Sequence, residues 1–237
     1  MISHKYKCIF IHIPKCAGTS IETVFGHLDN YHGRGGQDHR SIRMLEQPLI
    51  TKNTLSSQEN ISELIRRVRY QYTTQKNPRN KITLTREQYH SYYKFTFIRN
   101  PWARAYSWYE NVMRDNTHKH KSQITEPVPF NEFLRIFSGK GMLKPQTYWL
   151  KDFSGSIPLN YIGRFENLAE DFQAICKEMN ISTLSLPHKV VGSGKDYHQS
   201  YSQESIDLIK EVYREEIEMF QYSFEDSSVS GSLSSSI

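Results

Sequence analysis

The sequence predicts an α/β fold with a mostly parallel central sheet, because strand-like runs alternate with helix-like ones. Lys7 to Ile13 is a β-branched and aromatic run that Pro14 closes, and Thr19 to Phe25 then carries apolar residues at helical spacing. The same order returns at Tyr93 to Ile98, which precedes a helical stretch from Trp102 to Met113. Alternation of this kind is typical of a parallel sheet flanked by helices.

Further elements follow from weaker patterns. Asn160 to Ile162 resembles a third strand, and a helix is predicted after it as far as Met179. Phe130 to Phe137 and Gln203 to Phe220 are each predicted to form one helix. Asn60 to Tyr70 has the pattern of an amphipathic helix, with an apolar face opposite an arginine-rich one. The apolar face carries Ile61, Leu64, Ile65 and Val68, and the other carries Arg66, Arg67 and Arg69.

The chain is predicted to form a single domain with a tail. Its 237 residues suffice to bury a large core, and they include 15 Tyr, 12 Phe and 3 Trp, too many aromatic residues for a disordered chain. Neither an internal repeat nor a long linker interrupts the sequence. We predict one domain over residues 1–226 and a disordered Ser-rich tail over residues 227–237, which lack periodicity.

The sequence disfavours a membrane protein or a secreted precursor, and also a protein held by disulfides or zinc. Its apolar runs fall far short of the ~20 residues of a membrane span, and the first residues show no hydrophobic leader. Cys8, Cys16 and Cys176 form an odd set without a CxxC pair, so neither a disulfide framework nor a zinc site is indicated. We therefore expect a cytoplasmic protein without a membrane span.

The charge is distributed unevenly along the chain. Residues 1–121 contain 20 Lys and Arg against 9 Asp and Glu, whereas residues 122–237 contain 10 against 16. A basic half indicates an anionic ligand, which could be a nucleic acid, a phosphorylated cofactor or an acidic polysaccharide. Composition does not choose among the three.

The loop after the first strand has the features of an anion-binding site. A strand that ends in a Gly-containing turn and opens a helix points backbone N–H groups and the positive end of the helix dipole at one place. Lys15 adds a positive charge there, and Thr19 and Ser20 add hydroxyl donors. The loop is not a Walker A motif, because Lys15 precedes Gly18, and no acidic residue suited to hold magnesium ends a neighbouring strand. A purely structural turn with a solvated lysine remains the alternative.

A second pair of anion-binding candidates follows the second strand. Arg99 stands where that strand ends, at the edge where open α/β sheets bind ligands. Its guanidinium suits bidentate contact with a phosphate. Ser107 lies eight residues on, about two turns into the next helix, and offers a hydroxyl donor. Both side chains could reach one phosphate.

The ordered set of motifs resembles a known enzyme family. PKxxGTS follows the first strand, RNPxxRxxS follows a later one, and YIGRFENLAEDF begins at Tyr161. Together they are similar to the sulfotransferases that depend on 3′-phosphoadenosine 5′-phosphosulfate (PAPS), and most similar to the carbohydrate-type branch, sulfotransferase family 2, in its bacterial cytosolic form. The resemblance extends from Tyr6 to about Phe224 and implies a P-loop-like, nucleotide-binding sulfotransferase fold.

The resemblance implies roles for individual residues. The loop of Lys15, Cys16, Ala17, Gly18, Thr19 and Ser20 would hold the 5′-phosphosulfate, with the Lys15 ammonium near the oxygen that becomes the leaving group. The 3′-phosphate would be bound by Arg99 and Ser107. A late loop that closes over the nucleotide would contribute Ser193, Lys195, Tyr197 and Tyr201.

Sulfuryl transfer to a hydroxyl also requires a general base. Histidine suits this role because its pKa lies near neutral pH. Of the ten histidines, His39 is our candidate because related sequences place a His ahead of a short helix in this region. Two alternatives stay open: that His39 is a surface residue beside Asp38 and Arg40, and that His32 is the base. His12 lies on the predicted buried strand and is interpreted as a core residue.

These observations predict a PAPS-dependent sulfotransferase that needs no metal. It would transfer a sulfuryl group to a hydroxyl of an acceptor, which the resemblance implies is a carbohydrate or glycoconjugate. Nucleic acid is not an expected partner, and the oligomeric state is left open. The alternatives are an ATP-dependent kinase that uses the same loop and a nucleic-acid binder that uses the basic half.

Overall fold

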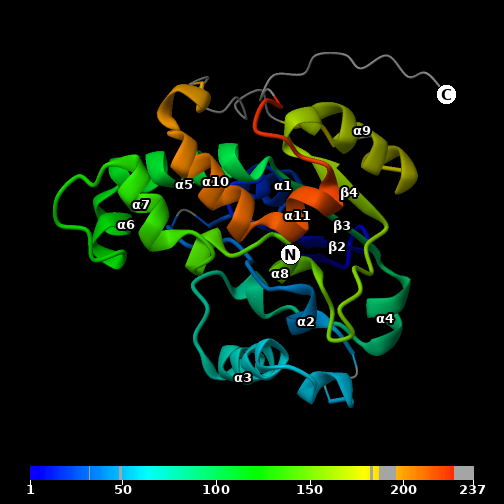
Figure 1. Cartoon of the computed structure of the whole chain (residues 1–237). Coiled ribbons are helices and arrows are strands. Elements are labelled where there is room, and N and C mark those ends of the chain that lie inside the picture. Colours follow the sequence, from blue (N-terminus) through cyan, green and yellow to red (C-terminus); the bar gives the residue numbers. More distant parts are fainter. Residues whose placement is uncertain (32, 48–49, 182–183, 187–195, 227–237) are drawn as a thin grey trace. The chain divides into compact units, whose positions relative to one another are not determined.

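The computed structural model describes residues 1–31, 33–47, 50–181, 184–186 and 196–226 (Figure 1). The chain divides into two compact units. Unit 1 comprises Met1–Ile98, Gln146–Gly163 and Leu168–Val190, and unit 2 comprises Arg99–Pro145, Arg164–Asn167 and Val191–Ile237. A single domain over residues 1–226 stays a prediction, and the Ser-rich tail lies outside the described residues.

A four-stranded sheet forms the centre of unit 1. Its strands stand in the order β1 (Ile2–Ser3), β2 (Cys8–Ile11), β3 (Tyr93–Ile98) and β4 (Tyr161–Arg164). β2 and β3 are parallel, with Phe10 opposite Phe95, whereas β1 pairs with β2 in the antiparallel direction. The predicted α/β fold with a mostly parallel sheet is confirmed.

The two central strands are buried along almost their whole length. Every residue of β2 is buried, as are all residues of β3 except Tyr93. Burial along the whole strand is typical of parallel strands that are covered on both faces. β4 approaches closely because Gly163 lacks a side chain: a Cβ there would lie 2.5 Å from the Phe97 ring.

Short helices and one long helix surround this sheet in unit 1. The helices are α1 (Gly18–Val24), α2 (Ile42–Leu45), α3 (Gln58–Tyr72), α4 (Arg86–Ser91), α8 (Thr147–Leu150) and α9 (Leu168–Glu178). Two 3-10 turns, Asn53–Leu55 and Pro78–Lys81, lie between them.

Aromatic rings in contact with one another connect the sheet of unit 1 to its helices. The Phe95 ring lies 5.2 Å from Phe10 on the neighbouring strand and 5.8 Å from Phe25, which follows α1. Phe25 in turn contacts Phe172 of α9 at 6.3 Å. These rings form the core that holds β2 and α1 in place, and with them the loop between.

The predicted helix at residues 60–70 forms, but the side that packs inward is not the expected one. In α3, Ile61, Ile65 and Val68 are 39%, 46% and 43% exposed, whereas Glu63 and Arg67 are buried. The reason is that α3 packs on α2 through polar groups. Arg67 donates to backbone carbonyl oxygens near α2, and Glu63 accepts a hydrogen bond from a serine hydroxyl. An amphipathic pattern therefore identified the helix but not its buried face.

Unit 2 consists of helices and turns. They are α5 (Pro101–Arg114), α6 (Asn116–Lys121), α7 (Phe130–Phe137), α10 (Gln203–Val212) and α11 (Arg214–Phe220), with 3-10 turns at Gly141–Leu143, Phe165–Asn167 and His198–Ser200. α5 begins with a proline in its first turn, and the Asn100 side chain caps it by accepting from Trp102 N at 3.0 Å. Arg104 is buried and donates to two carbonyl oxygens, those of Met142 and Lys144.

The single helix predicted from Gln203 to Phe220 is broken at Tyr213. Its backbone has φ −111° and ψ 22°, so α10 ends and α11 begins there. The buried Tyr213 hydroxyl donates to Leu143 O at 2.6 Å and accepts from Gly139 N at 3.0 Å. These contacts fix the tyrosine where the helix breaks.

Candidate active site

The predicted anion-binding loop is an irregular turn that leads from β2 into α1. Lys15 and Ala17 have positive φ values of 70° and 61°, and Ala17 is the N-cap of α1. Left-handed residues in such a turn direct successive N–H groups toward one side. No side chain caps α1, so the loop backbone forms its amino end.

The loop packs against the imidazole of His12. A Cβ at Gly18 would lie 2.0 Å from Cδ2 and 2.1 Å from Nε2 of His12, so only glycine fits at this position. On its other side the ring contacts α1, where Nδ1 lies 3.0 Å from Glu22 Oε1. His12 is buried, as predicted, and its ring packs against the loop at Gly18.

The side chains of the loop differ in exposure. Thr19 is exposed, and Lys15 and Ser20 are partly buried. Cys16 is fully buried with its Sγ 3.4 Å from Gln146 Oε1, which makes it a packing residue rather than a solvent-facing thiol. The hydroxyls and the ammonium are thus the groups of this loop that solvent reaches.

Glu22 connects this loop to the segment that carries His39. Its Oε1 accepts from His12 and also from the Asp38 backbone N at 3.0 Å. Burial raises the pKa of Glu22. The His12 imidazole, by its charge and its hydrogen bond, and the Met1 amino group lower the pKa by more in total, so the net pKa lies below the usual value. Glu22 is therefore a carboxylate at neutral pH, buried among its partners.

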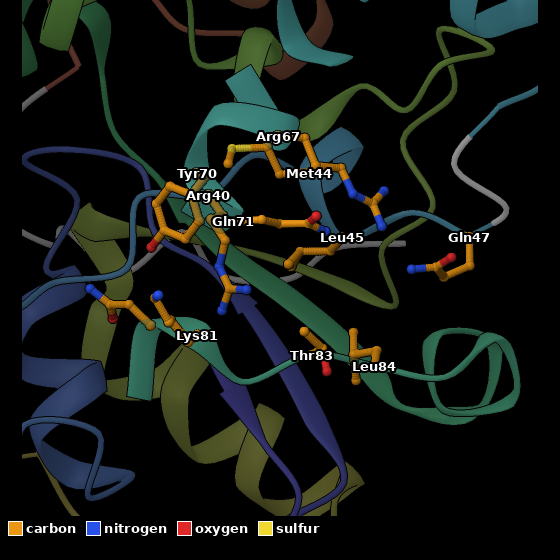
Figure 2. Close-up of a pocket in the computed structure, with 11 residues that line it drawn as sticks. Arg40, Met44, Leu45, Gln47, Arg67, Tyr70, Gln71, Lys81, Thr83 and Leu84 are labelled. Atoms are coloured by element: carbon orange, nitrogen blue, oxygen red, sulfur yellow. The ribbon is translucent and has the colours of Figure 1, made fainter. Parts of the chain in front are cut away.

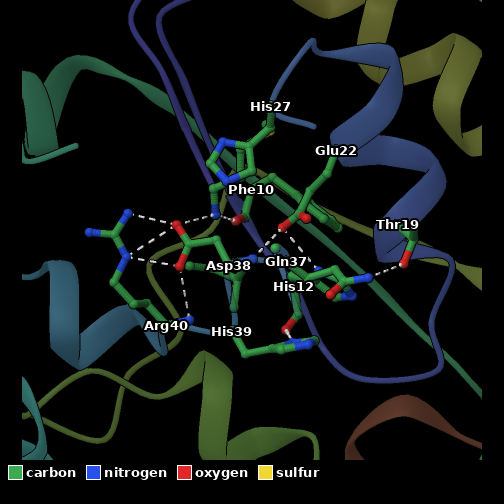
Figure 3. A network of polar contacts seen from close by, with 12 residues as sticks. Phe10, His12, Thr19, Glu22, His27, Gln37, Asp38, His39 and Arg40 are labelled. Atoms are coloured by element: carbon green, nitrogen blue, oxygen red, sulfur yellow. Dashed lines mark hydrogen bonds and ion pairs between the residues drawn. The ribbon is translucent and has the colours of Figure 1, made fainter. Parts of the chain in front are cut away.

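Asp38 and Arg40 fix the backbone on both sides of His39 (Figure 3). Asp38 is fully buried, and its carboxylate accepts from Arg40 Nε at 2.9 Å and from Nη2 at 2.6 Å. The amino group of Met1 lies 3.2 Å from the same carboxylate. Burial opposes ionisation of Asp38, but Arg40 and the Met1 amino group together outweigh burial, and the pKa is strongly lowered. We call His12, Glu22, Asp38, His39 and Arg40 the Asp38 network.

His39 is held as a neutral imidazole with one nitrogen available. Its Nδ1 lies 3.3 Å from His12 O, an acceptor, so Nδ1 carries the proton and Nε2 keeps a lone pair. The two imidazole rings are 4.2 Å apart. Burial, followed by the His12 imidazole, lowers the pKa of His39 to about 3. A short helix, α2, follows three residues later, as the sequence indicated.

The other candidate residues belong to unit 2. Arg99 directly follows β3 in the chain and its guanidinium lies 4.1 Å from the Phe165 ring centre. Ser107 is partly buried in α5. The Tyr197 hydroxyl donates to Phe224 O at 2.8 Å, and that of Tyr201 donates to Trp102 O at 2.9 Å. Ser193 and Lys195 lie outside the described residues.

The structure thus brings the Lys15–Ser20 loop and His39 together within unit 1 through shared contacts with His12. Sequence reasoning missed Glu22 and Asp38. Glu22 stands next to Ile21, an apolar position of the first helix, and a carboxylate beside a buried face is the signal that could have indicated it.

Two searches of the described residues were negative. No group of three or more His, Cys, Asp or Glu side chains in that part of the chain is arranged to hold a metal ion. None of its helices combines the length and hydropathy that a membrane crossing requires.

Comparison with known proteins gives one match. The model of the sulfotransferase family matches residues 1–223, which is nearly the whole chain. Searches of curated proteins and of solved structures found no match.

Proposed function

Because the chain belongs to the sulfotransferase family and is an enzyme of sulfuryl transfer, we propose that its donor is PAPS. The family generally uses this donor. The observation that carries the proposal is the turn at Lys15–Ser20, where left-handed residues and the uncapped start of α1 create a cradle for an anionic group. Its support by a buried His12 ring and Glu22 keeps that cradle preformed.

In this proposal the loop residues Lys15, Cys16, Ala17, Gly18, Thr19 and Ser20 bind the 5′-phosphosulfate. Backbone N–H groups and the two hydroxyls donate to its oxygens, and Lys15 stabilises the charge that develops on the leaving phosphate. Arg99 and Ser107 bind the 3′-phosphate, and Tyr197 and Tyr201 belong to the segment that encloses the nucleotide.

His39 is the proposed general base. In an in-line displacement the acceptor oxygen forms a bond to sulfur while the bond from sulfur to the phosphate oxygen breaks. The acceptor proton moves to Nε2 of His39, and the products are a sulfate ester and adenosine 3′,5′-bisphosphate. The Nδ1 contact with His12 O supports this assignment because it leaves Nε2 as the proton acceptor.

The low pKa of His39 fits a base that is tuned by its ligand. An imidazole with a pKa of about 3 is a weak base at neutral pH. A bound donor brings several negative charges, and nearby negative charge stabilises the imidazolium and raises its pKa. The base therefore gains strength when the donor is bound.

The acceptor is proposed to be a hydroxyl of a carbohydrate or glycoconjugate, on the basis of the motif resemblance. We also propose a reducing compartment such as the cytoplasm, because Cys8, Cys16 and Cys176 are all buried and none of these described residues forms a disulfide.

An assay with radiolabelled PAPS and a panel of mono- and oligosaccharides tests the proposed activity. We expect transfer of label to an acceptor with release of one adenosine 3′,5′-bisphosphate per sulfate ester. Transfer should not require added magnesium and should fall about 10²- to 10³-fold in Lys15→Ala, the loss seen when a group that stabilises developing charge is removed. Phosphate transfer from ATP with magnesium, and none from PAPS, would indicate the kinase alternative.

A further inference from the structure

Unit 1 contains a cavity of about 270 Å³ that is lined in part by Arg40 (Figure 2). Its walls come from α2, α3, the Pro78–Lys81 turn and the segment that follows this turn. We call it the Arg67 pocket and define it by Arg40, Met44, Leu45, Arg67, Lys81 and Leu84. It contains no residue of the Lys15–Ser20 loop.

The Arg67 pocket has an apolar floor and a polar mouth. Met44 and Leu45 are each 4% exposed and Leu84 is 9% exposed, so they form the inner surface. Gln71 and Lys81 also line the cavity but are exposed, which places them at its opening. A ligand that fits must be small, with an apolar part and a polar end.

The lining of the pocket has an excess of positive charge. Three cations line it and none of the described lining residues is acidic. Arg40 is neutralised by Asp38. Arg67 and Lys81 have no carboxylate within ion-pair distance in the part of the chain that the structure describes.

Arg67 is the unusual member, because it is buried and no carboxylate of the described residues lies within ion-pair distance of it. It is 8% exposed, and its Nη1 donates to Arg43 O at 3.3 Å and to Glu46 O at 2.6 Å. The Glu46 carboxylate accepts from Phe153 N instead. Within the described residues, Nε and Nη2 of Arg67 have no hydrogen-bond partner, so half of the guanidinium fork remains available.

The pKa of Arg67 lies below its ordinary value. Burial lowers it most, and the positive charge of Arg40 lowers it further, while the Glu46 carboxylate raises it only in part. Removing a cation from water is costly unless an opposite charge compensates. A protein keeps an arginine in such a place most readily when a ligand supplies that charge.

We propose that the Arg67 pocket binds a small organic anion, a phosphate, sulfate or carboxylate attached to an apolar body. The anionic group contacts Arg67, and the apolar body lies on Met44, Leu45 and Leu84. The site is separate from the proposed donor site and does not depend on the proposed PAPS chemistry. The ligand could be an anionic part of the acceptor or an independent effector, since both present the same chemistry to the pocket.

The test is an amide NMR titration of the full chain with phenyl phosphate, in the presence of saturating adenosine 3′,5′-bisphosphate. The bisphosphate occupies the donor site, so remaining shifts report another site. We expect shifts of the Gln71, Lys81 and Leu84 amides. Phenol, which lacks the anion, and inorganic phosphate, which lacks the apolar body, should each bind about tenfold more weakly, because each loses one of the two sets of contacts.

Two exposed positions provide variants that leave the buried arginine intact. Gln71→Glu adds a negative charge at the mouth and should weaken phenyl phosphate binding about tenfold, whereas Lys81→Met removes a more distant positive charge and should weaken it less. Lys52→Met is the matched control, since Lys52 is an exposed lysine of unit 1 outside the pocket.

Equal binding by the three variants would overturn the proposal, as would shifts confined to the Lys15–Ser20 loop or no shifts at millimolar phenyl phosphate. To distinguish the two sources, sulfuryl transfer to an acceptor found by the screen is measured with phenyl phosphate added. Competition with that acceptor identifies an acceptor subsite, and an effect on turnover without competition identifies an effector site.

Discussion

The Asp38 network and the Arg67 pocket share Arg40, but they differ in whether their buried charged side chains have partners of opposite charge. In the network each carboxylate has a partner: Asp38 binds Arg40, and Glu22 binds His12. In the pocket, Arg67 is buried with carbonyl partners and no counterion among the described residues. Paired charges fix the backbone, whereas an unbalanced cation leaves binding capacity for a ligand. Charge balance therefore distinguishes a positioning network from a binding site within one unit.

The largest expected effect concerns the chemistry that the network is proposed to support. His39→Ala should lower kcat by about 10²- to 10⁴-fold, the usual contribution of a general base, without changing the affinity for adenosine 3′,5′-bisphosphate. His90→Ala is the control, because His90 is an exposed histidine on α4. Steady-state kinetics and calorimetry make the comparison. Unchanged turnover in His39→Ala would leave the network a purely structural role and reopen His32 as the base.

A comparison of stability tests the difference in charge balance directly. Asp38→Asn leaves Arg40 without its partner and should lower the free energy of unfolding by about 3–5 kcal/mol, as breaking a buried ion pair does. Arg67→Met removes only bonds to carbonyl oxygens, and relief of an unbalanced charge offsets that loss, so a change of about 1 kcal/mol is expected. Urea unfolding measures both. Equal losses would mean that the two regions do not differ as described.

The same residues explain how far the sequence predicts this molecule. Strands β2 and β3 and helices α1, α5 and α7 follow from local periodicity, and the family follows from ordered motifs. The buried face of α3 does not, because the groups that receive Arg67 lie more than 20 positions away. Periodicity carries no information about such distant partners.

In the candidate site, too, some features could be predicted from the sequence and others could not. The Lys15–Ser20 loop and His39 could be proposed from motifs, since each belongs to a short recognisable stretch. The contacts that support them could not, because Glu22 reaches Asp38 across 16 residues and His39 reaches the His12 carbonyl across 27. Only the fold determines which distant polar groups meet.

The contact between the network and the loop provides a further test. Gly18→Ala places a methyl group within 2.0 Å of the His12 ring, so the ring or the loop must move. We expect a loss of about 1–3 kcal/mol in stability, as for an overpacked core, together with weaker adenosine 3′,5′-bisphosphate binding. Ala17→Gly is the neighbouring control: glycine relieves the positive φ of Ala17, so stability should not fall by this amount. Full stability and affinity in Gly18→Ala would show that this contact is dispensable.

The last expected effect is a pH dependence of stability, a gradual change with pH instead of a change caused by substitution. His39 has a folded pKa of about 3, below the ordinary histidine value of about 6.5, so the unfolded chain binds more protons between these values. Its contribution is complete above about pH 6.5 and is lost as the pH falls toward 3, by up to about 1.4 kcal/mol per pH unit. Urea unfolding at several pH values should show this slope and its reduction in His39→Ala. An unchanged slope in the variant would assign it to other groups.

Calorimetric titration with adenosine 3′,5′-bisphosphate, adenosine 5′-monophosphate and ATP with magnesium tests the proposed donor most directly, since it needs no acceptor. We predict that the bisphosphate binds at least about tenfold more tightly than the monophosphate, and that Arg99→Ala removes this difference, because a bond to a charged group is worth about 1.5–3 kcal/mol. Equal binding of bisphosphate and monophosphate, or preference for ATP with magnesium, would contradict PAPS as the donor.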